Sequence, residues 1–330
     1  MADNGIAKVQ HYVPQFLLRQ FGTGKKDQLH VFDKATGRTF VTNAKNVASE
    51  SRFYDFQLEE ANLTIEPALS KLESTAKPLL EQIVRDGKVT AFTALERADL
   101  CAFFAVQFTR TKNYRERFKS MSELLRERVE KMAPSAEAFK EFTKDVPEQN
   151  ENQLKLITAE SVLAAPREFG PLFNVKTWHV LATTAKRPFL IGDNPISMQN
   201  MIDMQPYGNL GLAVKGIEIY FPLTPTRALA MWCPSITDQI MQSSEQLRLI
   251  RSQAPEMLKQ LKDPDGLERL AAALASDTPL DYEPTHIENF NSLQISNAER
   301  YVFSNGENFG LVREMLSAHP HLSRGPRMKA

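Results

Sequence analysis

The 330-residue chain has few of the residues and patterns from which function is usually inferred. It contains only two cysteines, Cys101 and Cys233, which are far apart and have apolar neighbours. We expect two buried, reduced thiols, because this arrangement favours neither a disulfide nor a catalytic thiol. The 40 basic and 40 acidic residues cancel, so the net charge does not support a nucleic-acid partner, although a nucleic acid stays open as a substrate.

Signals for membranes and secretion are absent as well. No apolar run approaches the about 18 residues that a membrane-spanning helix requires. The N-terminal residues Met-Ala-Asp-Asn-Gly lack the charged and apolar regions of a signal peptide. We therefore expect a cytoplasmic protein with no membrane partner.

Standard catalytic motifs are also missing. The chain has neither a Gly-x-x-x-x-Gly-Lys loop nor a Gly-x-Gly-x-x-Gly turn, so nucleotide binding of those kinds is unsupported. It has no Gly-x-Ser-x-Gly nucleophile elbow. No cysteine or histidine pair has zinc-ligand spacing, and the pair His319 and His321 lies in the tail. The sequence alone therefore does not name a reaction.

What is present predicts an α+β fold. Residues 28–42 indicate a β-hairpin with Gly37 at its turn, and residues 175–232 contain further apolar strand patterns. Within the second region, the stretch 178–195 predicts a buried hairpin that ends on a polar turn, Gly-Asp-Asn-Pro. Pairing these strands gives a mixed or antiparallel sheet of about six strands.

A helix-rich insert at about 60–165 completes the predicted fold. Apolar residues recur there with the 3.6-residue period of a helix, and Thr93 with Glu96 forms a capping box at one helix start. We predict a single domain over residues 8–305, in which a helical layer packs on the sheet. Residues 306–330 are expected to be a C-terminal extension.

Polar residues stand at several positions where an apolar core face is expected. Gln107 and Arg110 align with Phe103 and Tyr114 along one helix face. Burying an amide or a guanidinium costs several kcal/mol unless it is paired, so such residues either connect core elements or face a pocket. Both interpretations stay open, and Glu66, at a helix start, equally fits a purely capping role.

The candidate residues occur in motifs that lie far apart in the chain. The motifs are His11-x-x-Pro14-Gln15-Phe16-x-Leu18-Arg19-x-Phe21, then Asn46, Phe53-Tyr54, Gln107-x-x-Arg110, Phe189-x-x-x-Asp193-Asn194-Pro195 and Phe221-Pro222-Leu223-Thr224-Pro225. Together they resemble the domain-of-unknown-function family 4238 over roughly residues 8–305. The resemblance implies a stand-alone cytoplasmic protein with no established activity, and it brings an association with candidate phage-defence loci. Gly192 stands where that family usually has serine, so no role transfers to that hydroxyl.

Our first hypothesis is a hydrolase that acts on a phosphate-containing substrate, such as a nucleotide or a nucleic acid. Its biological role would be that of a phage-defence effector. Asp193 would be the general base or a ligand of a divalent metal, with His11 as its acid–base partner and Glu66 as a further catalytic carboxylate. The remaining residues would bind substrate, with the arginines on the phosphate, and these are Gln15, Arg19, Asn46, Tyr54, Gln107, Arg110 and Asn194.

The alternative hypothesis is a binding or sensor module without chemistry, in which the same residues connect the N-terminal helix to the core. The two hypotheses differ in geometry. Convergence of His11, Arg110 and Asp193 around an open pocket favours the enzyme, whereas separate partners in a closed core favour the binding module.

Overall fold

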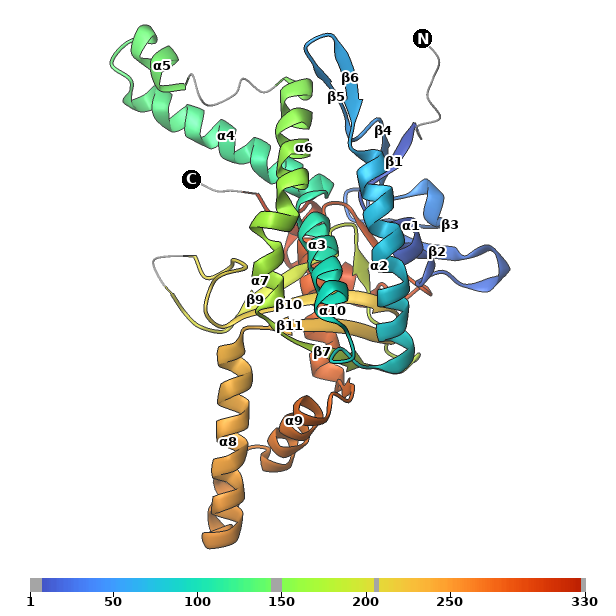
Figure 1. Ribbon diagram of the computed structural model, residues 1–330, viewed down its shortest axis with the longest axis vertical. Helices are drawn as coiled ribbons and strands as arrows, with labels where there is room; N and C mark the ends of the chain where they lie inside the picture. Colours follow the sequence, from blue (N-terminus) through green and yellow to red (C-terminus); the bar gives the residue numbers. More distant parts are fainter. Residues whose placement is uncertain (1–7, 144–149, 205–207, 328–330) are drawn as a thin grey trace.

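A five-stranded sheet lies at the centre of the protein, in the computed structural model, which describes residues 8–143, 150–204 and 208–327 (Figure 1). Its strand order is β12-β7-β11-β10-β9, and only the pairing of β12 with β7 is parallel. The bounds are Thr177–Ala182 (β7), Ser197–Asn200 (β9), Ile217–Thr224 (β10), Arg227–Trp232 (β11) and Leu280–Asp281 (β12).

The two faces of this sheet follow from the alternation of side chains along its strands. On β10, Ile219 and Phe221 point to one face, and Glu218 and Tyr220 point to the other. The first face is covered by helices α2, α3, α6 and α7 (Figure 1), where Phe104 packs edge-on against Phe221 at 5.2 Å between ring centroids. The bounds are Glu66–Asp86 (α2), Ala94–Thr109 (α3), Glu151–Glu168 (α6) and Gly170–Asn174 (α7).

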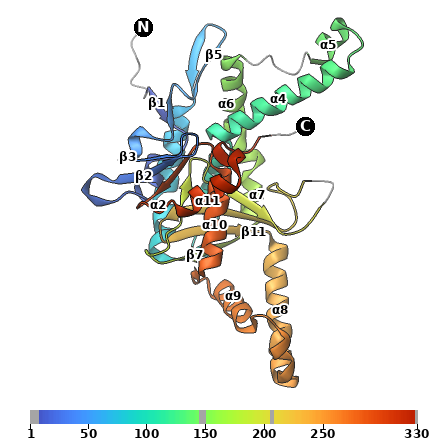
Figure 2. The same cartoon turned by 180° about the vertical axis from the view of Figure 1, so that it is seen from behind.

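The opposite face is covered by α10 and by the paired helices α8 and α9, of which α8 extends away from the body (Figure 2). Arg251 of α8 forms ion pairs with Asp265 and Glu268 of α9, so the two helices are joined. The bounds are Pro234–Gln253 (α8), Pro264–Ser276 (α9) and Pro284–Asn297 (α10).

A second, four-stranded sheet of order β3-β2-β13-β8 brings the two ends of the chain together. Helix α11 packs beside it through Val312, in a cluster with Phe32 and Val302. The bounds are Gln28–Asp33 (β2), Arg38–Asn43 (β3), Ile191–Gly192 (β8), Tyr301–Ser304 (β13) and Gly310–Ala318 (α11). The predicted C-terminal extension therefore contributes a helix to the packed structure.

The remaining elements are small pairs and projections around these sheets (Figure 1). Strands β1 (Val9–His11) and β4 (Ser49–Ser51) pair with each other, as do β5 (Asp55–Leu58) and β6 (Ala61–Thr64). The other helices are α1 (Gln15–Arg19), α4 (Lys112–Met132), α5 (Ala136–Thr143) and the 3-10 turns Gly24–Lys26, Ala44–Asn46, Pro255–Gln260 and Pro320–Ser323. In the described part of the chain, no helix combines the length and apolar character that crossing a membrane requires.

The α+β class is confirmed, with the strands divided between two main sheets. The predicted hairpin over residues 178–195 is wrong, because β7 and β8 belong to different sheets. The segment between them binds α10 instead: Asn291 accepts a hydrogen bond from the Leu190 N–H at 2.8 Å and donates one to the Pro188 carbonyl at 3.1 Å. One side chain from a distant helix thus provides the backbone hydrogen bonds that a second hairpin strand would have provided.

Candidate functional site

Asp193 lies in a closed turn directly after β8. Its Oδ1 accepts the N–H of Glu299 at 2.6 Å, and its Oδ2 accepts those of Arg300 and Tyr301, both at 3.0 Å. The carboxyl group is fully buried, and burial raises its pKa to about 6 against the effect of these N–H groups and of Lys34. Asp193 therefore fixes the start of β13.

Lys34 and Asn194 complete this Asp193 turn, a name we use for Lys34, Asp193 and Asn194. The Lys34 ammonium donates to the carbonyls of Ile295 at 2.7 Å and Ala298 at 2.6 Å, which end α10. Asn194 accepts from the Thr111 hydroxyl at 3.0 Å, and its amide nitrogen donates to neighbouring oxygens at 3.2 and 3.3 Å. Each of these three side chains has partners within the fold.

Arg110, at the C-terminal end of α3, is the middle of a second polar cluster. It is 1 % exposed, and its Nη2 donates to the His11 carbonyl at 2.9 Å and to the Glu73 carboxylate at 2.7 Å. Its Nε and Nη1 are buried without a partner. The Tyr54 hydroxyl, also buried, donates to the Arg110 carbonyl at 3.1 Å.

Gln107 and Glu66 add two more unpaired atoms to this cluster. The Gln107 Nε2 donates to the Tyr12 carbonyl at 3.1 Å, but its Oε1 is buried without a partner. The Oε2 of Glu66 is buried in the same state, and burial raises the pKa of Glu66 although Arg110 acts to lower it. We call Glu66, Glu73, Gln107 and Arg110 the Arg110 centre. It holds two guanidinium nitrogens, which carry three N–H groups, and two acceptor oxygens that have no hydrogen-bond partner within the protein.

A chain of hydrogen bonds leads from the Arg110 centre toward the surface. Exposed Arg19 donates to Gln15 Oε1 at 3.1 Å, and Gln15 Nε2 lies 3.3 Å from His11 Nδ1. Since the amide nitrogen only donates, Nδ1 accepts, and the His11 proton sits on Nε2, 3.3 Å from the Lys45 carbonyl. Burial lowers the pKa of His11, which agrees with this neutral tautomer.

The predicted residues thus fall into three places. Seven of them belong to the Arg110 centre, contact it, or lie on the chain of hydrogen bonds that leads from it, namely His11, Gln15, Arg19, Tyr54, Glu66, Gln107 and Arg110. Asp193 and Asn194 form the neighbouring closed turn, which meets the centre through the consecutive residues Arg110 and Thr111. Asn46 is exposed and donates to Thr42 at 3.0 Å, so it points elsewhere.

The chain as a whole matches a family model described as "Protein of unknown function (DUF4238)", over residues 9–308. This chain belongs to the DUF4238 family. No curated protein and no solved structure matches it. Membership places the Arg110 centre and the Asp193 turn inside the family's shared region.

Gly192 has a structural reason in this DUF4238 protein. A Cβ atom there would lie 2.9 Å from the Gln294 carbonyl oxygen and 3.0 Å from the Cβ of Ala298, both on or beside α10. Serine at this position would therefore require α10 to shift. The close approach of β8 to α10 therefore favours glycine at this position.

Glu73, which forms the ion pair with Arg110, was not among the residues predicted for the site. Glu66 and Glu73 are seven residues apart on α2, which is two helical turns, so both face Arg110. This seven-residue spacing is the feature of the sequence that could have identified Glu73 as a partner of Arg110. Among the described residues, no group of three or more His, Cys, Asp or Glu side chains is placed to hold a metal ion.

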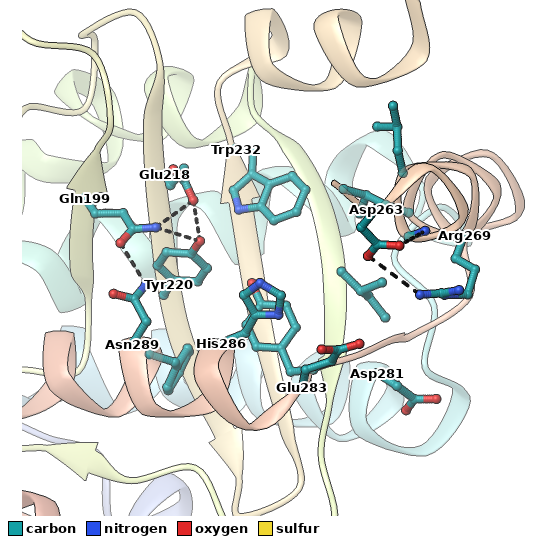
Figure 3. Close-up of a pocket in the computed structure, with 16 residues that line it drawn as sticks. Gln199, Glu218, Tyr220, Trp232, Asp263, Arg269, Asp281, Glu283, His286 and Asn289 are labelled. Atoms are coloured by element: carbon teal, nitrogen blue, oxygen red, sulfur yellow. Dashed lines mark hydrogen bonds and ion pairs between the residues drawn. The ribbon is translucent and has the colours of Figure 1, made fainter. Parts of the chain in front are cut away.

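The DUF4238 chain also has a pocket that none of the predicted residues lines (Figure 3). It lies on the sheet face covered by α9 and α10 and has a volume of about 370 Å³. Its lining combines aromatic and polar side chains, including Gln199, Glu218, Tyr220, Trp232, Tyr282 and His286. The signal for this pocket was the alternation of β10, which places Glu218 and Tyr220 on one face.

Proposed function

We propose that this DUF4238 protein hydrolyses a phosphate-containing substrate at the Arg110 centre. The proposal rests on one observation: Glu66, Gln107 and Arg110 present four buried polar atoms without partners. Burial also raises the pKa of Glu66 and lowers the pKa of the neighbouring His11. Leaving such atoms unpaired costs about 1–3 kcal/mol each, so a bound molecule that pairs with them is favoured. Three N–H groups and two acceptor oxygens are more than one water molecule can satisfy, and they suit a water molecule together with an oxygen atom of a polar substrate.

In this proposal Glu66 is the general base. Water attacks phosphorus while its proton passes to the Glu66 carboxylate, the phosphorus–oxygen bond to the leaving group breaks, and the proton moves to the leaving oxygen. The free N–H groups of Arg110 stabilise the negative charge on the phosphoryl oxygens. Gln107 orients the water because its Oε1 accepts a hydrogen bond from the second O–H group of the water.

His11 and Asp193 have positioning roles here. Both ring nitrogens of His11 are engaged, so it holds Gln15 and, through Gln15, the exposed guanidinium of Arg19 at the entrance. Asp193 accepts three backbone N–H groups and holds β13 and α10 in place. The acid–base role we first assigned to Asp193 therefore passes to Glu66.

A panel of phosphate compounds tests the proposal. We would incubate the purified protein with bis(p-nitrophenyl) phosphate, ATP, a short RNA and a short DNA duplex, in chelator and with added Mg²⁺, and measure product release. We expect turnover of one compound, and a loss of at least about 100-fold in Glu66→Gln, which keeps the shape but removes the base. Glu314→Gln, an exposed residue of α11, is the matched control.

Two results would contradict the hydrolase. One is no turnover of any compound by the unmodified protein in either condition. The other is turnover that survives Glu66→Gln at the control rate. A rate that increases with pH until Glu66 is ionised, above the usual range of a glutamic acid because its pKa is raised, would support the assignment.

Non-catalytic binding of a phosphate compound is the second candidate, and the closure of the centre favours it. Arg110 is 1 % exposed and Glu73, which covers it, is 25 % exposed. Such a site suits a ligand that is held rather than turned over. Inorganic phosphate or a nucleotide that raises the melting temperature without any product, and fails to do so in Arg110→Met, would select this function. The cytoplasmic location and the phage-defence setting stay predictions, since family membership carries no activity.

A further inference from the structure

The pocket on the α9–α10 face of the central sheet is separate from the Arg110 centre. Its floor comes from β9, β10 and β11, one side from α10 and the other from α9, and β12 closes one end (Figure 3). The α2–α3 layer that carries Glu66 and Arg110 covers the other face of the same sheet. The volume of about 370 Å³ suits a small organic molecule.

A fixed polar network occupies one side of the pocket. The Glu218 carboxylate accepts the hydroxyl of Tyr220 and, at 2.9 Å, the amide nitrogen of Gln199. The Gln199 oxygen in turn accepts from Asn289 of α10 at 2.9 Å, which sets the orientation of the amide (Figure 3). The negative charge of Glu218 is therefore held at a defined place in the wall.

Trp232 supplies a donor without an acceptor. It is 6 % exposed, yet its indole Nε1 is buried and has no partner. In Figure 3 that nitrogen lies on the side of the ring that faces Tyr220 and Glu218. An unpaired buried N–H is unfavourable, so a ligand that brings an oxygen acceptor gains binding energy by pairing with it.

Charge and aromatic rings select the kind of ligand. Four carboxylates line the pocket, namely Glu218, Asp263, Asp281 and Glu283, against one guanidinium, that of Arg269, which lies 3.9 Å from Asp263. The faces and edges of Tyr220, Trp232, Tyr282 and Phe290 form much of the remaining wall. Carboxylates attract a cation, and aromatic faces bind an ammonium group that has lost its water.

We propose that this pocket is a binding site for a small organic ammonium compound that also carries a hydrogen-bond acceptor for the Trp232 indole. The ammonium group lies near Glu218 among the aromatic rings, and the acceptor meets the Trp232 N–H. This site does not depend on the hydrolase, whose substrate is an anion and whose residues lie across the sheet.

Choline and its uncharged isostere 3,3-dimethyl-1-butanol test the proposal directly, because they differ only in the positive charge. By isothermal titration calorimetry on the full chain we expect saturable choline binding and at least about tenfold weaker binding of the isostere. Agmatine, an organic cation without an oxygen acceptor, should compete with choline only weakly, and inorganic phosphate should not compete.

Variants assign the binding to this pocket. Glu218→Gln and Trp232→Phe should each weaken choline binding about tenfold, and Glu283→Gln, at an exposed rim position, should weaken it less. Glu314→Gln carries the same loss of charge outside the pocket and should leave the affinity unchanged. Glu66→Gln should also leave it unchanged, which keeps the result independent of the hydrolase.

Three outcomes would overturn the proposal: equal binding of choline and the isostere, no saturable binding of either cation up to about 10 mM, or choline affinity that is the same in Glu218→Gln and Glu283→Gln as in Glu314→Gln. Because Glu283 is exposed, its variant keeps the test valid should a substitution of Trp232 disturb folding.

Discussion

The carboxylate of Asp193 and the guanidinium of Arg110 are buried to the same extent, yet they differ in how their polar atoms are used. Asp193 accepts three backbone N–H groups from successive residues, so both of its oxygens are occupied. Arg110 uses one nitrogen for two acceptors and leaves Nε and Nη1 unpaired. Burial alone therefore does not separate a scaffold residue from a site residue, whereas the count of satisfied atoms does.

The origin of the partners explains the difference. The Asp193 turn draws its donors from the main chain, which cannot move without breaking β13. The Arg110 centre draws its charged acceptor from the side chain of Glu73, which is 25 % exposed. We expect the first cluster to control stability and the second to tolerate change, and four measurements test this contrast.

The largest effect is expected for Asp193→Ala. The substitution leaves three buried N–H groups without an acceptor and removes the nearby negative charge from Lys34, so the free energy of unfolding should fall by about 3–5 kcal/mol. Urea denaturation measures it, with the exposed Asp238→Ala as the control, expected within about 0.5 kcal/mol. A loss below about 1 kcal/mol for Asp193→Ala would remove the contrast.

The pH dependence of Asp193 should come next. Its pKa rises from 3.8 to about 6 on folding, so between these values the folded state holds a proton that the unfolded state has lost. The unfolding free energy of the unmodified protein should therefore fall by about 3 kcal/mol, relative to Asp193→Asn, as pH increases from about 3 to about 7. Urea titrations of both proteins at several pH values measure the difference, and a difference that grows in the opposite direction contradicts burial as the dominant cause.

Arg110→Met should have a smaller effect on stability. It removes the hydrogen bonds to the His11 carbonyl and Glu73, but it also removes the two unpaired nitrogens with their three N–H groups, and Glu73 can become hydrated. We expect a loss of about 1–3 kcal/mol by urea denaturation. A loss equal to that of Asp193→Ala would mean that Arg110 is as fully integrated into the fold, and the spare donors would lose their significance.

The smallest effect is expected at the exposed end of the hydrogen-bonded chain. Arg19 is bonded only to Gln15 among the contacts described above, so Arg19→Ala should change the unfolding free energy by no more than about 0.5 kcal/mol. The same variant should lower the affinity of the Arg110 centre for any phosphate compound that binds there. Measuring both quantities separates a role in recognition from one in folding, and a large loss of stability would assign Arg19 to the scaffold.

The sequence predicted local features well and distant partners poorly. The hairpin of β2 and β3, the capping box of Thr93 and Glu96, and the burial of Gln107 and Arg110 all followed from residues close in sequence. The hairpin over 178–195 failed because its second half is bound by Asn291, about a hundred positions later. Short apolar strand patterns do not specify a partner, and here a side chain on α10 decided the pairing.

The same limit applies to the candidate site. The spacing of Gln107 and Arg110 predicted a polar patch on α3, but it contained no information on Glu73 or on the three N–H groups that surround Asp193. Likewise, the alternation of Glu218 and Tyr220 was visible, whereas the pocket above them depends on how α9 and α10 pack. Which polar atoms remain unpaired is a property of the assembled molecule.

The seal around Asp193 and Lys34 has a consequence for how the chain is made. The carbonyls that bind Lys34 lie 261 and 264 positions later in the chain, and the first N–H group that binds Asp193 lies 106 positions later. During synthesis both charges remain in water until the segment around residues 295–301 has emerged, so the four-stranded sheet cannot close from its N-terminal part alone. Contacts of such long range favour slow folding. A chain that ends before residue 295 would lack the hydrogen-bond partners of the Lys34 ammonium and the Asp193 carboxylate.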